Sequence, residues 1–187
     1  GAPFLQALRQ RCDEVGALLV FDEVQCGMGR SGHAFAADLY SVRPDMITTA
    51  KALGNGFPCA ALLMTPRVTK AVRMETLGTT FGGGPMACAA IEAVIEAIER
   101  EDLLANVRRV SQYMRETCRV GPVTGFQGEG FLLGLRMNRP AKELQAALLA
   151  RDILTGTSGD PEVLRLLPPF VLREEHVDLL KGALATL

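Results

Sequence analysis

The apolar residues of the chain follow two patterns, one typical of helices and one typical of buried strands. In the first fifteen residues they recur every three or four positions, which predicts an amphipathic helix that stops at Gly16. Short, mainly apolar runs then occupy residues 17–21, 46–50 and 59–64. Short runs bounded by polar residues and glycine predict strands that are buried on both faces. Helices, strands and glycine-rich turns in this order predict an α/β domain.

Residues with capping or helix-starting preferences mark where later helices should begin. Thr65 followed by Pro66 predicts a helix that runs to about Met74, with Thr65 as its cap. A long amphipathic helix should end near Arg100, and Asp102 should cap the helix after it.

Beyond Arg100 the helices and strands no longer alternate strictly. Residues 123–127 and 131–137 predict an antiparallel pair, with a helix at about 141–151, strands at 153–157 and 163–167 and a final helix. This pattern is typical of a smaller α+β domain. We therefore expect two domains, residues 1–100 and residues 101–187.

Composition narrows the function classes. A formal net charge of −1 and the lack of a basic run argue against nucleic-acid binding. Five scattered cysteines without a CxxC pair indicate reduced thiols in a cytoplasmic protein, and two distant histidines argue against a metal site. No apolar run approaches the roughly 20 residues that a membrane span needs.

The candidate chemistry lies where the first two apolar runs end. Asp22 closes the first run and Lys51 follows the second. Open α/β sheets bind ligands at the carboxyl ends of their parallel strands, so both side chains are expected at a ligand-binding edge. An acid and a lysine there suit pyridoxal 5'-phosphate, because the lysine can hold the aldehyde as a Schiff base while the acid faces the pyridine nitrogen.

Two other interpretations of the same residues stay open at this point. The run LLVFDE at 18–23 also resembles a Walker B strand, but the phosphate loop that an ATPase needs is missing, and Ala52 follows Lys51 where that loop has Ser or Thr. The other alternative is a buried strand with a solvated acidic end and no chemistry at all.

Four motifs in fixed order carry a resemblance to a known family. They are DEVQCGMGRSG at 22–32, PDMITTAKALGNGFP at 44–58, GTTFGGGP at 78–85 and RLLPP at 165–169. Together they resemble the class III aminotransferases, which use pyridoxal phosphate on the fold type I scaffold. The resemblance implies the C-terminal part of a large doubly wound sheet domain followed by a small α+β domain. It covers about the second half of a family member, so we expect the chain to be a C-terminal half.

The resemblance also implies a role for each matching residue. Asp22 would pair with the pyridine nitrogen, Val24 would pack on the ring and Gln25 would bond its phenolic oxygen. Lys51 would be the catalytic Schiff-base lysine, and Thr80 would donate to the cofactor phosphate of the partner subunit in a homodimer.

The resemblance further implies a substrate grip and an activity. Arg165 would bind the substrate α-carboxylate with its two-pronged guanidinium. The pattern is most similar to members that move an amino group from N2-acetylornithine to 2-oxoglutarate in arginine biosynthesis. The alternatives are another class III aminotransferase, acting on ornithine, succinylornithine, succinyl-diaminopimelate or another ω-amine, or a non-catalytic fragment. Gly84 stands where the family usually has Asn, and Leu77 where it often has His.

Overall fold

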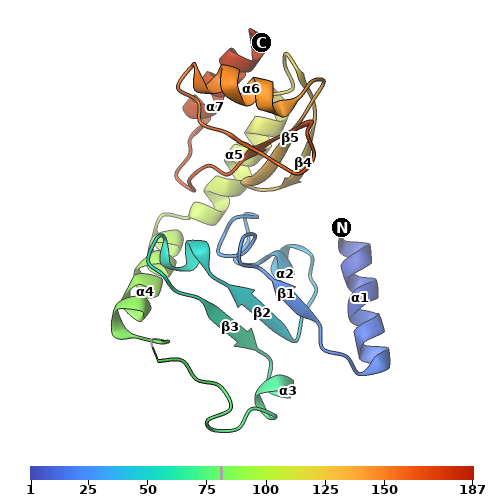
Figure 1. Cartoon of the computed structure of the whole chain (residues 1–187), viewed down its shortest axis with the longest axis vertical. Coiled ribbons are helices and arrows are strands. Elements are labelled where there is room, and N and C mark those ends of the chain that lie inside the picture. The colour runs from blue at the N-terminus through green and yellow to red at the C-terminus, as the bar shows by residue number, and fades with distance from the viewer. Residues whose placement is uncertain (81) are drawn as a thin grey trace. The chain divides into compact units, whose positions relative to one another are not determined.

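The computed structural model describes residues 1–80 and 82–187 as two compact units, coloured from blue to red in Figure 1. The first unit comprises Gly1–Gly29 and His33–Glu101, and the second comprises Arg30–Gly32 and Asp102–Leu187. Each unit has its own sheet, and each is described by itself below.

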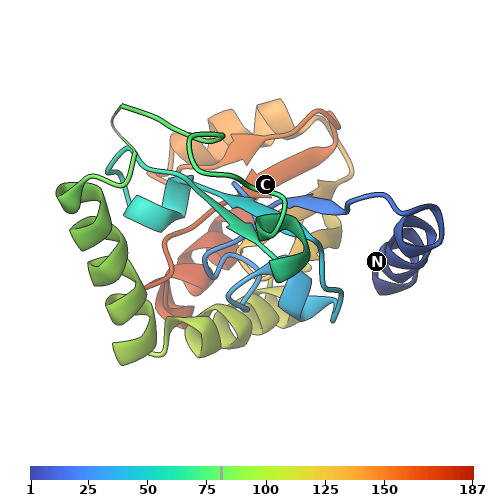
Figure 2. The same ribbon diagram turned by 90° about the horizontal axis from the view of Figure 1, so that it is seen from below.

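The first unit is built around a three-stranded sheet in the order β1-β2-β3. Its strands are β1 (Val20–Asp22), β2 (Met46–Thr49) and β3 (Ala61–Met64), with β1 parallel and β3 antiparallel to β2. Its helices are α1 (Ala2–Val15), α2 (Ala36–Leu39), the 3₁₀ helix η1 (Lys51–Gly54), α3 (Pro66–Thr69) and α4 (Pro85–Arg100). Figures 1 and 2 show α1 on the β1 side of the sheet and α4 on the opposite side, beyond β3.

Asp45 ties α1 to the sheet. Its buried carboxylate accepts a 2.8 Å hydrogen bond from the backbone N–H of Leu19 and forms a 2.7 Å ion pair with Arg9 of α1. Arg67 lies 3.5 Å from its other oxygen. The Leu19 amide and the Arg9 guanidinium together lower the pKa of the Asp45 carboxyl below its ordinary value of 3.8.

The lowered pKa of Asp45 predicts a loss of stability in acid. The unfolded chain takes up a proton near the ordinary pKa while the folded Asp45 stays ionised, so stability is full above about pH 4 and falls as the pH drops toward the folded pKa. In urea titrations at pH 6 and pH 3, Asp45→Asn should be less stable than the parent at pH 6, and the difference should shrink at pH 3.

Asp13→Asn is the matched control, because Asp13 pairs with the same Arg9 but is 60% exposed. It should change stability by less than about 0.5 kcal/mol at either pH. A constant difference between parent and Asp45→Asn from pH 6 to pH 3 would contradict the prediction.

Three sequence-based expectations are wrong in this unit. The strand that ends at Asp22 is not buried on both faces, since Leu18 and Val20 are 46% and 47% exposed. The sheet has only three strands, and its two faces are incompletely covered. The helix that begins at Pro66 ends at Thr69, well before Met74, because the residues after it find little to pack against and Met74 is 95% exposed. Thr65 stands at its N-cap without a side-chain cap bond, and its hydroxyl is buried without a partner among the described residues.

The second unit packs three helices against a four-stranded antiparallel sheet in the order β4-β5-β7-β6. The strands are β4 (Val123–Glu129), β5 (Leu132–Met137), β6 (Gly156–Thr157) and β7 (Val163–Leu166). The helices are α5 (Leu103–Thr117), α6 (Ala141–Leu149) and α7 (Glu174–Ala185). Asp102 is the N-cap residue of α5, as expected, but with a left-handed backbone (φ 47°) and no side-chain cap bond.

One face of this sheet carries the core. Leu135 and Leu164, paired across β5 and β7, are fully buried, and Val107 and Val110 of α5 join the same cluster. The apolar side chains in the central turns of α5 therefore face the core. Burying aliphatic side chains of this size contributes about 1.5–3 kcal/mol each, so this face holds the sheet in place.

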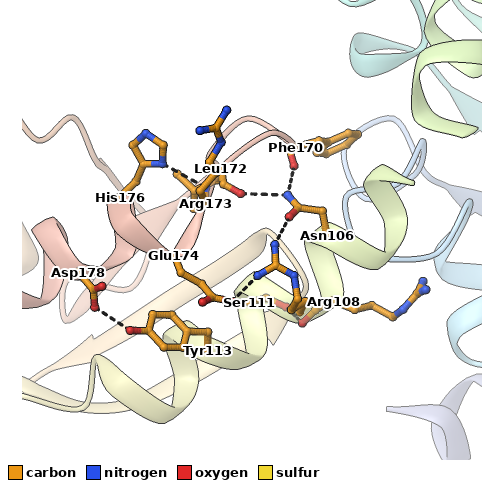
Figure 3. Close-up of polar contacts among 11 residues, drawn as sticks. Asn106, Arg108, Ser111, Tyr113, Phe170, Leu172, Arg173, Glu174, His176 and Asp178 are labelled. Carbon is orange, nitrogen blue, oxygen red and sulfur yellow. Dashed lines mark hydrogen bonds and ion pairs between the residues drawn. The ribbon is translucent and has the colours of Figure 1, made fainter. Parts of the chain in front are cut away.

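Polar contacts fix the segment that follows β7 (Figure 3). The side-chain amide of Asn106 on α5 donates to the backbone oxygens of Phe170 and Leu172, at 2.6 and 2.9 Å. The Tyr113 hydroxyl donates to Asp178 of α7 at 2.8 Å. Helix α5 thus anchors both the loop after β7 and the helix after that loop.

Candidate active site

Asp22 and Lys51 lie at the same edge of the first unit's sheet. Strands β1 and β2 are adjacent and parallel, with Asp22 paired with Thr48, and Lys51 comes three residues beyond Thr48. Both side chains are exposed. The structure therefore bears out the expectation that the two runs are neighbouring parallel strands with their carboxyl ends together.

The carboxylate of Asp22 is oriented by two hydrogen bonds. Its Oδ1 accepts from the backbone N–H of Val24 at 3.1 Å and from the Thr48 hydroxyl at 3.2 Å. Among the described residues no hydrogen bond to Oδ2 is found, and the side chain is exposed. Such partners fix a carboxylate for a positively charged ligand group without neutralising it.

The neighbouring Glu23 has a different task, which the sequence pattern did not indicate. Its side chain is 2% exposed and accepts hydrogen bonds from the backbone N–H groups of Ala36 and Ala37, at 2.6 and 2.8 Å. These are unpaired donors at the start of α2, where a negative charge is favourable. The two acids at the end of β1 therefore have different roles. The Asp22 side chain is exposed, whereas Glu23, directly after the strand, holds the start of α2 by two hydrogen bonds.

Removing the hydrogen bonds between Glu23 and α2 should lower the stability of the fold. Glu23→Ala leaves two backbone donors without a partner in a buried place, and we expect it to lower the free energy of unfolding by about 3 kcal/mol. Glu23→Gln keeps one of the two acceptor oxygens and leaves the other backbone donor without an acceptor, so it should cost about half as much. Chemical denaturation of the two variants measures the difference, and equal losses would refute the role of the paired acceptors.

Lys51 sits on a strained and well-supported turn. Its φ of 43° is in the left-handed region that non-glycine residues rarely adopt, and it opens η1, whose Leu53 and Gly54 are buried. A Cβ on Gly54 would lie 2.5 Å from the Cys59 sulfur, so the backbone of the turn packs against Cys59 at a distance that leaves no room for a side chain. Helix α4 contacts η1. Backbone strain held by its surroundings is common at functional positions.

The surroundings of Cys26, which stands next to Gln25, disfavour reactivity of its thiol. Its sulfur is 3.8 Å from the Asp22 backbone oxygen and 3.8 Å from a Glu23 carboxylate oxygen. Burial, with the nearby Glu23 charge, raises the pKa of the Cys26 thiol to about 11. The thiolate needed for nucleophilic chemistry is therefore scarce at neutral pH.

The remaining predicted residues of the first unit are exposed or half-buried and are held less firmly. Val24 and Gln25 stand in the turn directly after Asp22, with Val24 half-buried and Gln25 exposed. Thr80 is exposed in the loop before α4, next to Phe81, which lies outside the described residues. Gly84 is the N-cap of α4 with an extended backbone that any residue can adopt, so its backbone gives no reason for glycine there.

Arg165 belongs to the second unit, on the exposed face of β7. Leu164 and Leu166 on either side of it point into the core, at 0% and 7% exposed, whereas Arg165 is exposed. No ion pair between described residues involves its guanidinium. It is therefore available to an external carboxylate.

The side chains at the strand edge fit pyridoxal phosphate by their chemistry. An outward carboxylate suits the protonated ring nitrogen, the Gln25 amide suits the phenolic oxygen and the Lys51 amine suits the aldehyde. All three follow the ends of β1 and β2. Thr48 completes this set as the partner of Asp22. Thr48 lies within the motif at 44–58, but only the strand register shows that it is paired with Asp22.

An α/β sheet with this acid and lysine at its carboxyl edge fits the pyridoxal-phosphate transferase class, and comparison with known proteins gives the family. Residues 2–187 match the family described as "Aminotransferase class-III", so the chain belongs to the class-III aminotransferases. Members of this family use pyridoxal 5'-phosphate.

Individual relatives and structures agree with the family assignment. The mitochondrial acetylornithine aminotransferase of Alnus glutinosa is 40% identical over 180 residues, which are 94% of this chain and 40% of that protein. The acetylornithine/succinyldiaminopimelate aminotransferase of Yersinia pestis is 39% identical over 183 residues, 93% of this chain and 45% of that protein. The crystal structure of acetylornithine aminotransferase from Elizabethkingia anophelis matches with a TM-score of 0.89 and 26% identity, covering 100% of this chain and 52% of that one. The chain thus spans about half the length of the proteins it matches.

Within residues 1–80 and 82–187, no helix has both the length and the apolar character needed to cross a membrane.

Proposed function

We propose that the protein carrying this chain moves an amino group from N2-acetylornithine to 2-oxoglutarate. The observation that carries the proposal is the placement of Asp22 and Lys51 on adjacent parallel strands, with the Asp22 carboxylate oriented by Thr48 and Val24. The relatives named acetylornithine aminotransferase support the choice of amino donor.

The residues of the chain would divide the work as follows. When bound, pyridoxal phosphate would supply a ring that accepts the electron pair released at the substrate carbon that bears the amino group. The Asp22 carboxylate would hold the proton on the ring nitrogen, and Gln25 would orient the ring through its phenolic oxygen. The Nζ amine of Lys51 would hold the aldehyde between turnovers and, once released, take the proton from the substrate carbon and deliver it to the cofactor.

Substrate and partner contacts complete the proposal. Arg165 would grip the α-carboxylate that acetylornithine, glutamate and 2-oxoglutarate share. The protein would act as a cytoplasmic homodimer, in which Thr80 donates to the phosphate of the partner's cofactor.

One observation supports succinyl-diaminopimelate as a second amino donor. The Yersinia pestis relative carries both acetylornithine and succinyldiaminopimelate in its name. Both donors present an α-carboxylate to Arg165 and an ω-amine to the lysine, so the residues described here serve either.

Borohydride trapping with pyridoxal phosphate, followed by peptide mass spectrometry, tests the proposal. We expect a label on Lys51 and none on Lys70, Lys142 or Lys181. Relative rates of the unreduced, cofactor-loaded protein with acetylornithine, succinyl-diaminopimelate and ornithine then choose the donor. A label scattered over the lysines, or absent, would reject Lys51 as the cofactor lysine of this protein and favour a non-catalytic fragment.

A further inference from the structure

Arg165 lies between two glycines on the exposed face of the second unit's sheet. Paired residues of adjacent strands share a face, and the register places Gly134 of β5 on one side of Arg165 and Gly156 of β6 on the other. Gln127 of β4 is paired with Gly134, so the row reads Gln127, Gly134, Arg165, Gly156 across the four strands.

The two glycines meet different neighbours. A Cβ on Gly134 would collide with Val163 Cγ1 at 2.8 Å and with Gln127 Cγ at 2.9 Å, so packing between strands accounts for that glycine. The three atoms nearest to a Cβ on Gly156 would all belong to Arg165: Nε at 3.3 Å, Nη2 at 3.4 Å and the backbone oxygen at 3.6 Å. The guanidinium therefore lies directly over the backbone of Gly156.

The backbone of Gly156 gives no separate reason for glycine. Its φ is outside the left-handed region, so an alanine there adopts the same conformation without strain. Glycine inside a strand commonly marks a place where another group approaches closely. The group that approaches Gly156 is the head of Arg165.

We propose that Gly156 is a positioning residue that seats the Arg165 guanidinium for a substrate carboxylate, an inference that rests on the proposed role of Arg165. An added methyl group would push Nε and Nη2 away by about half an ångström, to ordinary contact distance. A bidentate pair with a carboxylate depends on the fixed position of both guanidinium nitrogens, and a shift of that size spoils it.

The test measures carboxylate binding apart from turnover. Glutarate carries two carboxylates but no reacting carbonyl, so its dissociation constant from the cofactor-loaded protein reports the grip alone. Calorimetry should give an approximately tenfold higher dissociation constant for Gly156→Ala and for Gly156→Ser. In kinetics, KM for 2-oxoglutarate should rise similarly while kcat stays within about twofold. Gly159→Ala is the matched control, because no atom lies within 4 Å of its Cβ position.

A double-mutant cycle separates positioning from a general effect on the strand. In the Arg165→Gln background, Gly156→Ala should leave glutarate binding unchanged, since the displaced group is gone. If Gly156→Ala weakened glutarate binding equally in both backgrounds, the inference would be overturned. It would also be overturned if Gly156→Ala bound glutarate normally while Arg165→Gln bound it much more weakly. That second result would leave the proposed function standing. If Arg165→Gln itself bound glutarate normally, the proposed substrate role of Arg165 would fail, and the inference with it.

Discussion

Lys51→Ala is expected to lower the rate of amino-group transfer by about 10⁴-fold, the upper end of what a positioned acid–base group contributes. The variant loses the amine that would hold the cofactor aldehyde and, in the same turnover, the base that would move the substrate proton. The φ of 43° at Lys51 is costly for lysine and for alanine alike, so the turn itself should change little. Steady-state rates with acetylornithine and 2-oxoglutarate, with a borohydride trap on the same sample, measure both losses.

Lys70→Ala is the control for this experiment. Lys70 is also an exposed lysine of the first unit and stands at the end of α3, so the charge removed is the same. It should keep the parent rate within about twofold. A Lys51→Ala protein with more than a tenth of the parent rate would contradict the assignment of Lys51, whatever the family membership of the chain.

The strand edge that carries Asp22 and Lys51 could be predicted because both residues follow apolar runs. Local patterns of this kind depend on neighbours in sequence, and the structure confirms two adjacent parallel strands there. The buried face of α5 follows a local pattern of the same kind, since Val107, Val110 and Met114 recur at helical spacing and are buried.

Features set by contacts far along the chain could not be predicted in this way. The exposure of Val20 depends on which other parts of the chain pack on its sheet. The residues of its own run show only the apolar pattern of a buried strand. The burial of Glu23 depends on α2, thirteen residues later. The hydrogen bond from Thr48 to Asp22 depends on the strand register. The contact between Gly156 and Arg165 likewise depends on the register in which β6 and β7 pair.

Asp22→Asn should be the second most damaging change. Asparagine keeps the size of the side chain and an oxygen that can accept from Val24 and Thr48, so the strand end stays as it is. It loses the negative charge that would hold a proton on the ring nitrogen, and the ring then withdraws electrons less strongly as the substrate carbon loses its proton. Removing one such electrostatic partner typically costs about 10²–10³ in kcat, and we expect a loss near 10³-fold.

Thr48→Val separates the charge of Asp22 from its orientation. Valine matches threonine in shape and suits a strand, but it removes the 3.2 Å hydrogen bond to Oδ1 while the carboxylate stays charged. We expect kcat to fall by about tenfold, the usual effect of removing a group that orients a ligand-binding side chain. A Thr48→Val loss as large as that of Asp22→Asn would mean that orientation dominates. An Asp22→Asn protein with the parent rate would show that the carboxylate faces no positive charge during turnover, and the pyridine-nitrogen role would have to be abandoned.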